Sequence, residues 1–377
     1  MLKVDILLPD TSAYDVLHHF SQKIFEAFQR AGCVCRLLEG SQRFLLPLES
    51  PPDFTLGFNG ALKIEGGSLF CDYIGLRHVA CLVDSPFRFM DLISSPNVAL
   101  TCDDEYCCES FKTNFFKNTF FMPHAVEKEL ATEKEVAKIY DVVMLATFVD
   151  CEHRREEWKE KFPIDICRSM QEAVELTLGD EQTSYIFALE QTLGGHFKNI
   201  DLNLLQSIIS EVELYIKGRD KLDLLQSISD CPVHIFGDSL DCKNWAEFSQ
   251  SYPNIVVHPG VTFLEALEIM KRTKILLNTS IKNKRGAHER FFSGAAAGAV
   301  VVTNDNAYMR EHFVDGKELI LYRRSDVNDL NLQIHDLLND EPRRIEMSKQ
   351  ARIKVLAHHT WDHRVAQLLA DIIDSQA

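Results

Sequence analysis

Residues 278–305 carry the side chains best suited to bind an anionic ligand. The stretch reads NTSIKNKRGAHERFFSGAAAGAVVVTND. Within it, three of four consecutive residues are cations, namely Lys282, Lys284 and Arg285. A helix that begins near residue 287 or 288 would point its unpaired backbone N–H groups and its positive dipole end toward this loop. Helix N-termini and Lys and Arg side chains are the groups that bind phosphate in proteins. The pattern therefore predicts a phosphate or diphosphate site.

Further candidates flank the loop on both sides. Asn278 and Ser280 end a buried strand, and His288, Glu289 and Arg290 open the expected helix. Each feature has a simpler explanation, because a Lys/Arg run in a loop is usually solvated and a Glu in a first helical turn suits the dipole. The coincidence of all of them between two buried strands favours a binding site.

The elements before this segment alternate short apolar runs with amphipathic stretches. A helix is predicted over 14–31, and strands are predicted over 4–9, 34–39, 54–59, 78–84, 97–103 and 119–125. Ligands of open parallel sheets bind beyond the carboxyl ends of the strands. The polar residues Asn59, Gly60, Asp84 and His124 stand at such ends. They are therefore candidates for a second group of site residues, although Asp and Asn at strand ends also simply form turns.

A second series follows a charged stretch, 128–140, which we interpret as the connection between two domains. Its strands are predicted over 141–147, 233–238, 254–260, 274–280, 299–305 and 318–323. The loops after the first two of these strands hold Thr147 and Gly237. Between those strands, residues 150–230 show helical periodicity, which indicates a lid, an acceptor-binding element or a helical cover for the sheet.

These patterns predict an α/β protein with two Rossmann-like, doubly wound domains that face each other across a cleft. The first domain is expected over 1–127 and the second over 141–359, with the helical insertion 150–230 in the second. A last amphipathic helix over 360–377 could pack back on the first domain.

Composition and charge limit the possible partners. The net charge of −16 argues against nucleic acid as a general partner, because no basic surface is available to replace phosphate counterions. No apolar run approaches the roughly 18–20 residues that span a bilayer, and the N-terminus MLKVDILLPD begins directly with a strand. We therefore expect a cytoplasmic protein without a transmembrane segment. The 11 cysteines are scattered and form no CxxC pair, so no structural zinc site is predicted. No metal and no cofactor are expected elsewhere in the chain.

The segment from about residue 233 to the C-terminus resembles group-1 glycosyltransferases, in particular the spore-maturation-protein-like (CgeB-like) branch. The matching pieces are LNTS, RGAHERFF, AAAGAVVVTND, DGKELILY and HTWDHR, with weaker echoes in DFTLGFNG, LVDSPFRF, FMPHA and DVVMLATF. The resemblance implies the GT-B fold. It also implies transfer of a sugar from a nucleotide-diphosphate sugar, which the second domain binds, usually without a metal.

Roles for individual residues follow from the resemblance. Glu289 would bind the hydroxyls of the donor's ribose, although Ser293 stands where the family's second Glu is expected. The remaining donor-binding candidates for the diphosphate and its surroundings are Thr147, Gly237, Asn278, Ser280, Lys284, Arg285, His288 and Arg290. Preorganised cations and a helix N-terminus would stabilise the departing diphosphate.

The acceptor side is expected in the first domain, with Asn59 and Gly60 as binding residues and Asp84 and His124 as catalytic ones. Asp84 would be the general base if the enzyme inverts configuration, and a donor phosphate oxygen would replace it if the enzyme retains configuration. A protein, a lipid-linked sugar, a polysaccharide and a small molecule all stay open as acceptors. Two other functions stay open as well, a nucleotide-sugar epimerase and a non-catalytic nucleotide-sugar-binding protein.

Overall fold

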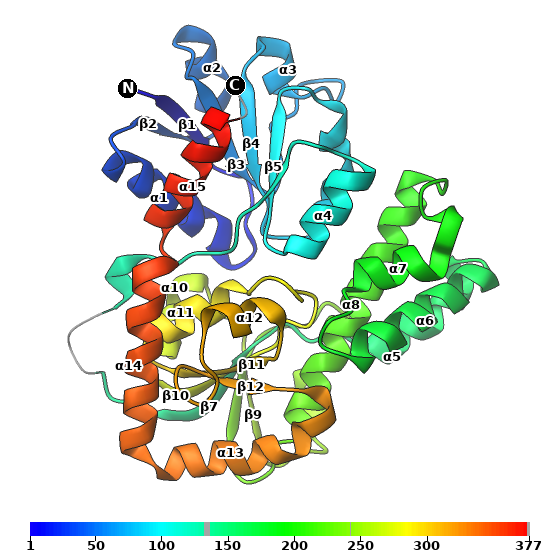
Figure 1. Ribbon diagram of the computed structural model, residues 1–377, viewed down its shortest axis with the longest axis vertical. Helices are drawn as coiled ribbons and strands as arrows, with labels where there is room; N and C mark the ends of the chain where they lie inside the picture. The colour runs from blue at the N-terminus through cyan, green and yellow to red at the C-terminus, as the bar shows by residue number, and fades with distance from the viewer. Residues whose placement is uncertain (132–135, 242, 375–377) are drawn as a thin grey trace. The chain divides into compact units, whose positions relative to one another are not determined.

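The computed structural model describes residues 1–131, 136–241 and 243–374. The chain forms two compact units (Figure 1). Unit 1 comprises Met1–Glu127 together with His358–Ala377, and unit 2 comprises Lys128–Ala357. Each unit contains one six-stranded sheet whose strand pairs are all parallel.

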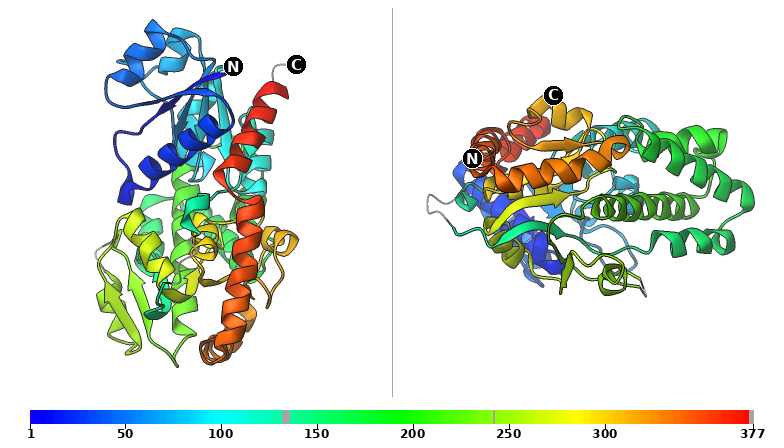
Figure 2. Two further views of the ribbon diagram at one scale, coloured as in Figure 1. Left: turned by 90° about the vertical axis from the view of Figure 1, so that its left-hand side faces the viewer. Right: turned by 90° about the horizontal axis from the view of Figure 1, so that it is seen from below.

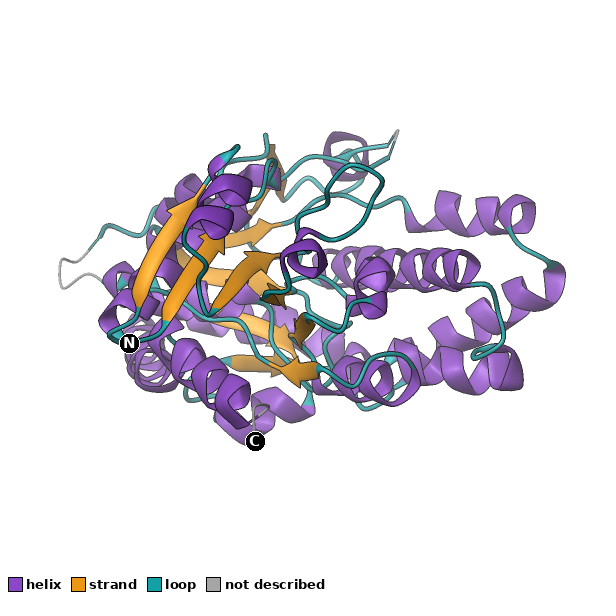
Figure 3. Ribbon diagram, turned by 90° about the horizontal axis from the view of Figure 1, so that it is seen from above, coloured by secondary structure: helices purple, strands orange, loops and turns teal. Residues whose placement is uncertain are grey.

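The sheet of unit 1 has the order β2-β1-β3-β4-β5-β6. Its strands are β1 (Lys3–Leu7), β2 (Val34–Leu38), β3 (Phe54–Phe58), β4 (Arg77–Cys81), β5 (Val98–Cys102) and β6 (Thr119–Phe121). Figure 3 shows the arrows nearest the N-terminus running in one direction. The strand order reverses between β1 and β3, and such a switch point opens a crevice at the carboxyl ends of the strands.

The helices of unit 1 are α1 (Val16–Arg30), α2 (Gln42–Glu49), α3 (Phe70–Ile74), α4 (Glu105–Asn114) and α15 (Trp361–Asp374). Short 3-10 helices occur at η1 (Ala13–Asp15) and η2 (Pro86–Ser94). The C-terminal helix α15 packs on α1, where the Trp361 ring lies 5.2 Å from that of Phe20, between ring centroids. Arg30 and Asp362 form an ion pair of 2.6 Å at the same contact. Helix α15 thus contributes to the core of unit 1.

The sheet of unit 2 has the order β12-β11-β10-β7-β8-β9. Its strands are β7 (Tyr140–Leu145), β8 (Val233–Phe236), β9 (Ile255–His258), β10 (Thr273–Asn278), β11 (Val300–Asn304) and β12 (Ile320–Tyr322). The first strand lies in the middle, and the chain builds outward from it in both directions. This is the strand order of dinucleotide-binding Rossmann folds, with the switch point between β7 and β10.

Apart from the helices between β7 and β8 and the turn before α13, the described part of unit 2 contains seven helices. They are η3 (Lys128–Leu130), α9 (Trp245–Ser249), α10 (Phe263–Lys271), α11 (Glu289–Ala296), α12 (Ala307–His312), α13 (Val327–Asn339) and α14 (Glu341–His358). A short turn, η5 (Arg324–Asp326), precedes α13. Of the connection predicted over 128–140, residues 132–135 lie outside the described residues.

A group of helices fills the predicted insertion between β7 and β8. Its members are α5 (Cys151–Lys161), α6 (Ile164–Gly179), α7 (Tyr185–Leu193), η4 (Gly194–His196) and α8 (Leu202–Gln226). The right-hand view of Figure 2 shows these green helices beside one another. The end of α8 and the residues after it place Leu224, Leu225 and Ile228 in the core against the sheet. Helix α8 also packs on α5, α6 and α7. The helical insertion is confirmed, and part of it covers the sheet.

All twelve predicted strands are present, but each ends earlier than expected. The polar residues at the predicted carboxyl ends leave the hydrogen-bonded ladder and form the loops that follow. Among the described residues, no helix combines the length and the hydropathy that crossing a bilayer requires.

Candidate functional site

The switch point of unit 2 brings together the carboxyl ends of β7 and β10, where Thr147, Asn278 and Ser280 lie. Asn278 is 1% exposed and donates from Nδ2 to Thr303 Oγ1 at 3.0 Å. Its side-chain oxygen has no hydrogen-bond partner among the described residues although it is buried. A buried acceptor of this kind is costly unless a ligand or solvent satisfies it. The position therefore fits a binding role for Asn278.

The loop after β10 is held by two asparagines at the end of β11. Asn304 Oδ1 accepts a hydrogen bond of 2.6 Å from the backbone N–H of Ser280. Asn306 Nδ2 donates to the carbonyl oxygens of Asn283, at 2.7 Å, and Gly286, at 3.2 Å. These contacts fix the backbone of the loop. Asn304 falls within the predicted strand 299–305 and Asn306 just beyond it, and the sequence did not predict this function for either side chain.

Helix α11 begins where the sequence predicted, with His288 as its N-cap. The Nδ1 atom of His288 lies 3.3 Å from the backbone nitrogen of Arg290 and also contacts the Glu289 carboxylate. Arg290 Nη2 lies 3.4 Å from His288 Nε2, and its Nε lies 3.8 Å from Glu289 Oε1. Three predicted donor-binding side chains thus form one cluster at the positive end of the helix dipole.

Lys221 on α8 is a candidate that sequence reasoning missed. It is 7% exposed and donates from Nζ to the carbonyl oxygen of Thr147 at 2.8 Å, at the end of β7. Burial lowers the pKa of Lys221 well below its usual value, and the positive charges of Lys217 and Arg290 lower it further, whereas Asp220 raises it. The buried Lys221 amine and the Arg290 guanidinium therefore lie near the same carboxyl end of the sheet.

The structure gives Lys284 and Arg285 protein partners. Lys284 is 4% exposed and donates from Nζ to the carbonyl oxygens of Thr177, at 3.1 Å, and Asp180, at 2.8 Å. These carbonyls lie at the end of α6, so Lys284 caps that helix and ties the insertion to the loop. Arg285 lies 3.5 Å from the Glu311 carboxylate. Neither contact was predicted, and both compete with the expected role in binding diphosphate.

Gly237, predicted as a donor-binding residue, has a packing explanation at the end of β8. A Cβ atom built there would lie 1.9 Å from the carbonyl oxygen of Ala146, a distance no side chain can adopt. Only glycine allows this approach of the two backbones.

We expect Gly237→Ala to lower the free energy of unfolding by about 3 kcal/mol, because the clash is with backbone and cannot be relieved by a rotamer change. Chemical denaturation measures the effect. Gly179→Ala is the matched control, since a Cβ at that helical position meets no atom within 4 Å. An unchanged midpoint for Gly237→Ala would show that the close approach does not exist.

In unit 1, Asn59 and Asp84 lie together at the ends of β3 and β4. Asn59 has a φ of 52° and accepts at Oδ1 from the backbone N–H of Val83 at 2.9 Å. Its Nδ2 donates to Asp84 Oδ2 at 2.9 Å, and Arg88 lies 3.5 Å from the other carboxylate oxygen. Gly60 continues the turn with a φ of 138°. Asn59 and Asp84 are therefore joined by hydrogen bonds, and Gly60 is their neighbour in the chain, with its carbonyl oxygen 2.9 Å from His78 Nε2.

His124 lies apart from that group, two strands away. Its Nε2 is 3.4 Å from Asp103 Oδ2, and both side chains are buried at the ends of β6 and β5. Arg364 on α15 donates to the His124 carbonyl oxygen at 3.0 Å. The structure thus pairs His124 with Asp103, the polar residue at the end of the neighbouring predicted strand 97–103.

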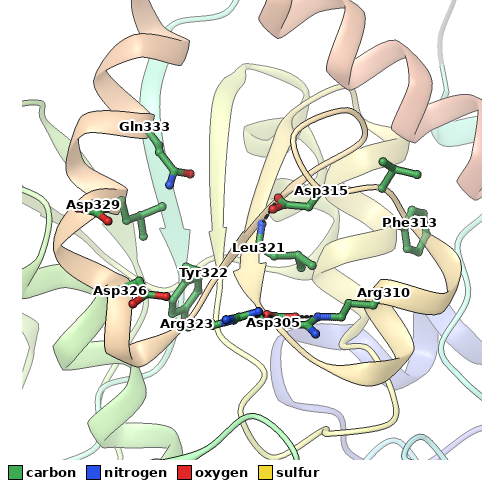
Figure 4. A pocket seen from close by; sticks show the side chains of 12 residues that line it. Asp305, Arg310, Phe313, Asp315, Leu321, Tyr322, Arg323, Asp326, Asp329 and Gln333 are labelled. Atoms are coloured by element: carbon green, nitrogen blue, oxygen red, sulfur yellow. Dashed lines mark hydrogen bonds and ion pairs between the residues drawn. The ribbon is translucent and has the colours of Figure 1, made fainter.

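A cavity of about 600 Å³ lies at the β12 edge of unit 2 (Figure 4). In it, Asp305 forms ion pairs with both Arg310 and Arg323, and Asp315 accepts from the backbone N–H of Leu321 at 2.8 Å. None of the predicted donor-binding residues lines this cavity. Among the described residues, no group of three or more His, Cys, Asp or Glu side chains is arranged to hold a metal ion.

Residues 219–370 match the model of a protein family described as glycosyl transferase-like. The match includes Lys221, the loop after β10 and all of α11. None of the curated proteins compared with the chain matches it.

Solved structures of similar fold include several glycosyltransferases. An α-glucosyltransferase in complex with UDP-glucose and DNA has a TM-score of 0.60 at 10% identity, with 99% of each chain covered. AviGT4, a glycosyltransferase of avilamycin A biosynthesis, has a TM-score of 0.58 at 10% identity, with 98% of this chain and 97% of that one covered. HepE from Anabaena, in complex with UDP and glucose, has a TM-score of 0.54 at 10% identity, with both chains fully covered.

These likenesses show that the fold is that of the GT-B glycosyltransferases, as the sequence predicted. The family match and the fold together support the prediction of a glycosyltransferase.

Proposed function

We propose that the chain transfers a sugar from a nucleoside diphosphate sugar to an acceptor hydroxyl, and that unit 2 binds the donor. The observation that carries the proposal is the switch point between β7 and β10. There the buried Lys221, Arg290 and the start of α11 combine inside the segment matched by the glycosyl transferase-like family.

The residues suggest how the donor is bound. Lys221, Arg290 and the first N–H groups of α11 would bind the diphosphate, and Glu289 would accept hydrogen bonds from the ribose hydroxyls. UDP-sugars are the first donors to test, because HepE and the α-glucosyltransferase were solved with UDP or UDP-glucose. We also propose that the chain belongs to the spore-maturation-protein-like branch of these enzymes, because it contains the motifs RGAHERFF and HTWDHR.

The chemistry needs a site that stabilises a leaving anion. The bond between the donor's anomeric carbon and the diphosphate oxygen breaks, and a bond to the acceptor oxygen forms. The acceptor's proton passes to a base, and negative charge builds on the diphosphate. Preorganised cations in a buried site stabilise that charge strongly. We therefore propose that the reaction needs no metal, and we expect full activity in EDTA.

A panel of nucleotide sugars tests the function. The expected result is nucleoside diphosphate release that rises when an acceptor is added. Isomerised donor without release would indicate an epimerase, and tight binding without turnover would indicate a binding protein. Candidate acceptors are a protein, a lipid-linked sugar, a polysaccharide and a small molecule. The net charge of −16 argues against DNA.

Asp84 is our candidate for the base that takes the acceptor's proton. We expect Asp84→Asn to lower kcat by about 100-fold with the donor KM unchanged, because a general base contributes at least that factor. Initial rates at saturating donor measure it. Asp91→Asn, which removes an exposed carboxylate paired with Lys63, is the control. An unchanged kcat would remove Asp84 as the base and favour a donor phosphate oxygen.

A further inference from the structure

Asp220 is a carboxylate buried on α8, next to Lys221 in the chain. It is 1% exposed, and its Oδ1 accepts hydrogen bonds from Asn304 Nδ2 at 3.1 Å and from Tyr322 Oη at 3.4 Å. The nearest guanidinium nitrogen of Arg324 lies 4.0 Å from the same oxygen. Asp220 Oδ2 has no hydrogen-bond partner among the described residues. The carboxylate thus makes its contacts through one oxygen, toward the ends of β11 and β12.

The contact with Asn304 decides which way that amide points. An ionised carboxylate can only accept hydrogen bonds, so the NH₂ group of Asn304 must face Asp220. The oxygen of Asn304 then faces the backbone N–H of Ser280, at 2.6 Å. The reversed amide would place two acceptors together at Asp220 and two donors together at Ser280. Asp220 therefore selects the orientation in which Asn304 holds the loop after β10.

We propose that Asp220 is a positioning residue, which orients Asn304 and thereby fixes Ser280 and the loop 279–287 for donor binding. The proposal rests on the function proposed above, because it gives that loop the task of receiving the donor. Asp220 itself would not touch the donor. It would act through Asn304 and the Ser280 backbone.

The burial of Asp220 is unfavourable for folding, which supports a functional reason for its presence. Burial raises the pKa of Asp220 to about 6, and the nearby Asp223 raises it, whereas Arg324, the Asn304 hydrogen bond and Lys284 lower it. Tyr322 and Lys221 also face this carboxylate. A folded-state pKa above the usual value means that stability falls as pH rises from about 4 to about 6. At neutral pH the ionised group therefore lowers stability, a cost typical of functional sites.

Two substitutions separate positioning from mere packing. Asp220→Leu removes the acceptor, and Asp220→Asn keeps an acceptor oxygen at similar volume. Asp223→Asn is the matched control on the same helix, because it removes a carboxylate that pairs with Arg324 and Arg219 but does not contact Asn304.

Kinetics with UDP-glucose, or with whichever donor the panel identifies, give the first readout. We expect Asp220→Leu to raise the donor KM about tenfold, the effect of losing one charged hydrogen bond, with a smaller change in kcat. Asp220→Asn should restore the KM. Protonation of Asp220 below its pKa of about 6 leaves Oδ1 as an acceptor for Asn304, so the wild-type KM, like that of Asp220→Asn, should stay the same as pH falls through 6. Asp223→Asn should behave as the wild type does.

Hydrogen–deuterium exchange gives a readout that does not depend on the donor. We expect faster exchange in residues 279–287 of Asp220→Leu, with a melting temperature at pH 8 no lower than that of the wild type. If that variant does not fold, the pair Asp220→Asn with Asn304→Asp replaces it. The double variant keeps the donor and acceptor pattern, and it should recover the exchange protection that Asn304→Asp alone loses.

The outcomes distinguish this proposal from the proposed function. Wild-type KM and wild-type exchange in Asp220→Leu would overturn the positioning role even if the enzyme transfers sugar. A wild-type protein that uses no nucleotide sugar would overturn the proposed function, and the exchange experiment would still decide whether Asp220 fixes the loop.

Discussion

Lys221→Met is expected to lower kcat for sugar transfer by about 1000-fold while the protein stays folded. The amine donates to the Thr147 carbonyl oxygen at 2.8 Å, so it is held at the end of β7 before the donor arrives. A preorganised donor aimed at developing charge contributes about that factor, and a fixed amine needs no reorganisation as the diphosphate leaves.

The stability of this variant should change little. Burial holds the pKa of Lys221 well below its usual value, which means that the charged amine is unfavourable in its folded surroundings. Met has a similar length and no charge, so its gain in burial offsets the lost hydrogen bond to Thr147. Thermal unfolding and steady-state kinetics on the same preparation measure both effects.

Lys217→Met provides the matched control, since Lys217 lies one turn earlier on α8. Its Nζ pairs with Glu213 at 3.3 Å, and its side chain is 29% exposed. We expect this variant to keep nearly all of its kcat. If Lys221→Met retained wild-type kcat and donor KM, the donor site would have to lie elsewhere in the molecule.

Arg290→Ala is expected to lower kcat/KM by about 100-fold. The guanidinium lies beside His288 and Glu289 at the start of α11, where the helix dipole also favours an anion. Removing it should weaken both donor binding and stabilisation of the leaving group, because charge-assisted bonds to phosphate act in both states. Glu289→Ala should mainly raise the donor KM, since the ribose is bound equally in both states.

Arg310→Ala is the control for charge. Arg310 is half exposed, and Asp305 keeps Arg323 as a partner when Arg310 is removed. We expect wild-type kinetics for this variant and unchanged unfolding for all three. Wild-type kinetics in both Arg290→Ala and Glu289→Ala would show that the cluster at the start of α11 is not the donor site.

The sequence alone determined the number and order of the strands and the position of the helical insertion. Apolar runs of strand length, separated by helical periods and turn residues, predicted all twelve strands and the helical insertion. The sequence also predicted a helix start near residue 287 or 288, and α11 begins at Glu289 with His288 as its N-cap. These features depend on the pattern of residues within short windows of sequence, so they can be predicted without knowledge of tertiary contacts.

The tertiary structure decided which charged side chains serve the site. Nothing in the sequence distinguished Asp220 and Lys221 from the other residues of their helix. In the fold, Lys221 contacts Thr147, 74 residues earlier, and Asp220 contacts Asn304, 84 residues later. Lys284 looked like a phosphate ligand, but it binds Thr177, 107 residues away, at the end of α6. Burial and pairing arise between segments that only folding brings together, and they set the charge and orientation on which binding depends. The loop 279–287 can therefore be predicted from the sequence, whereas the side chains that fix its conformation can be identified only from the tertiary structure.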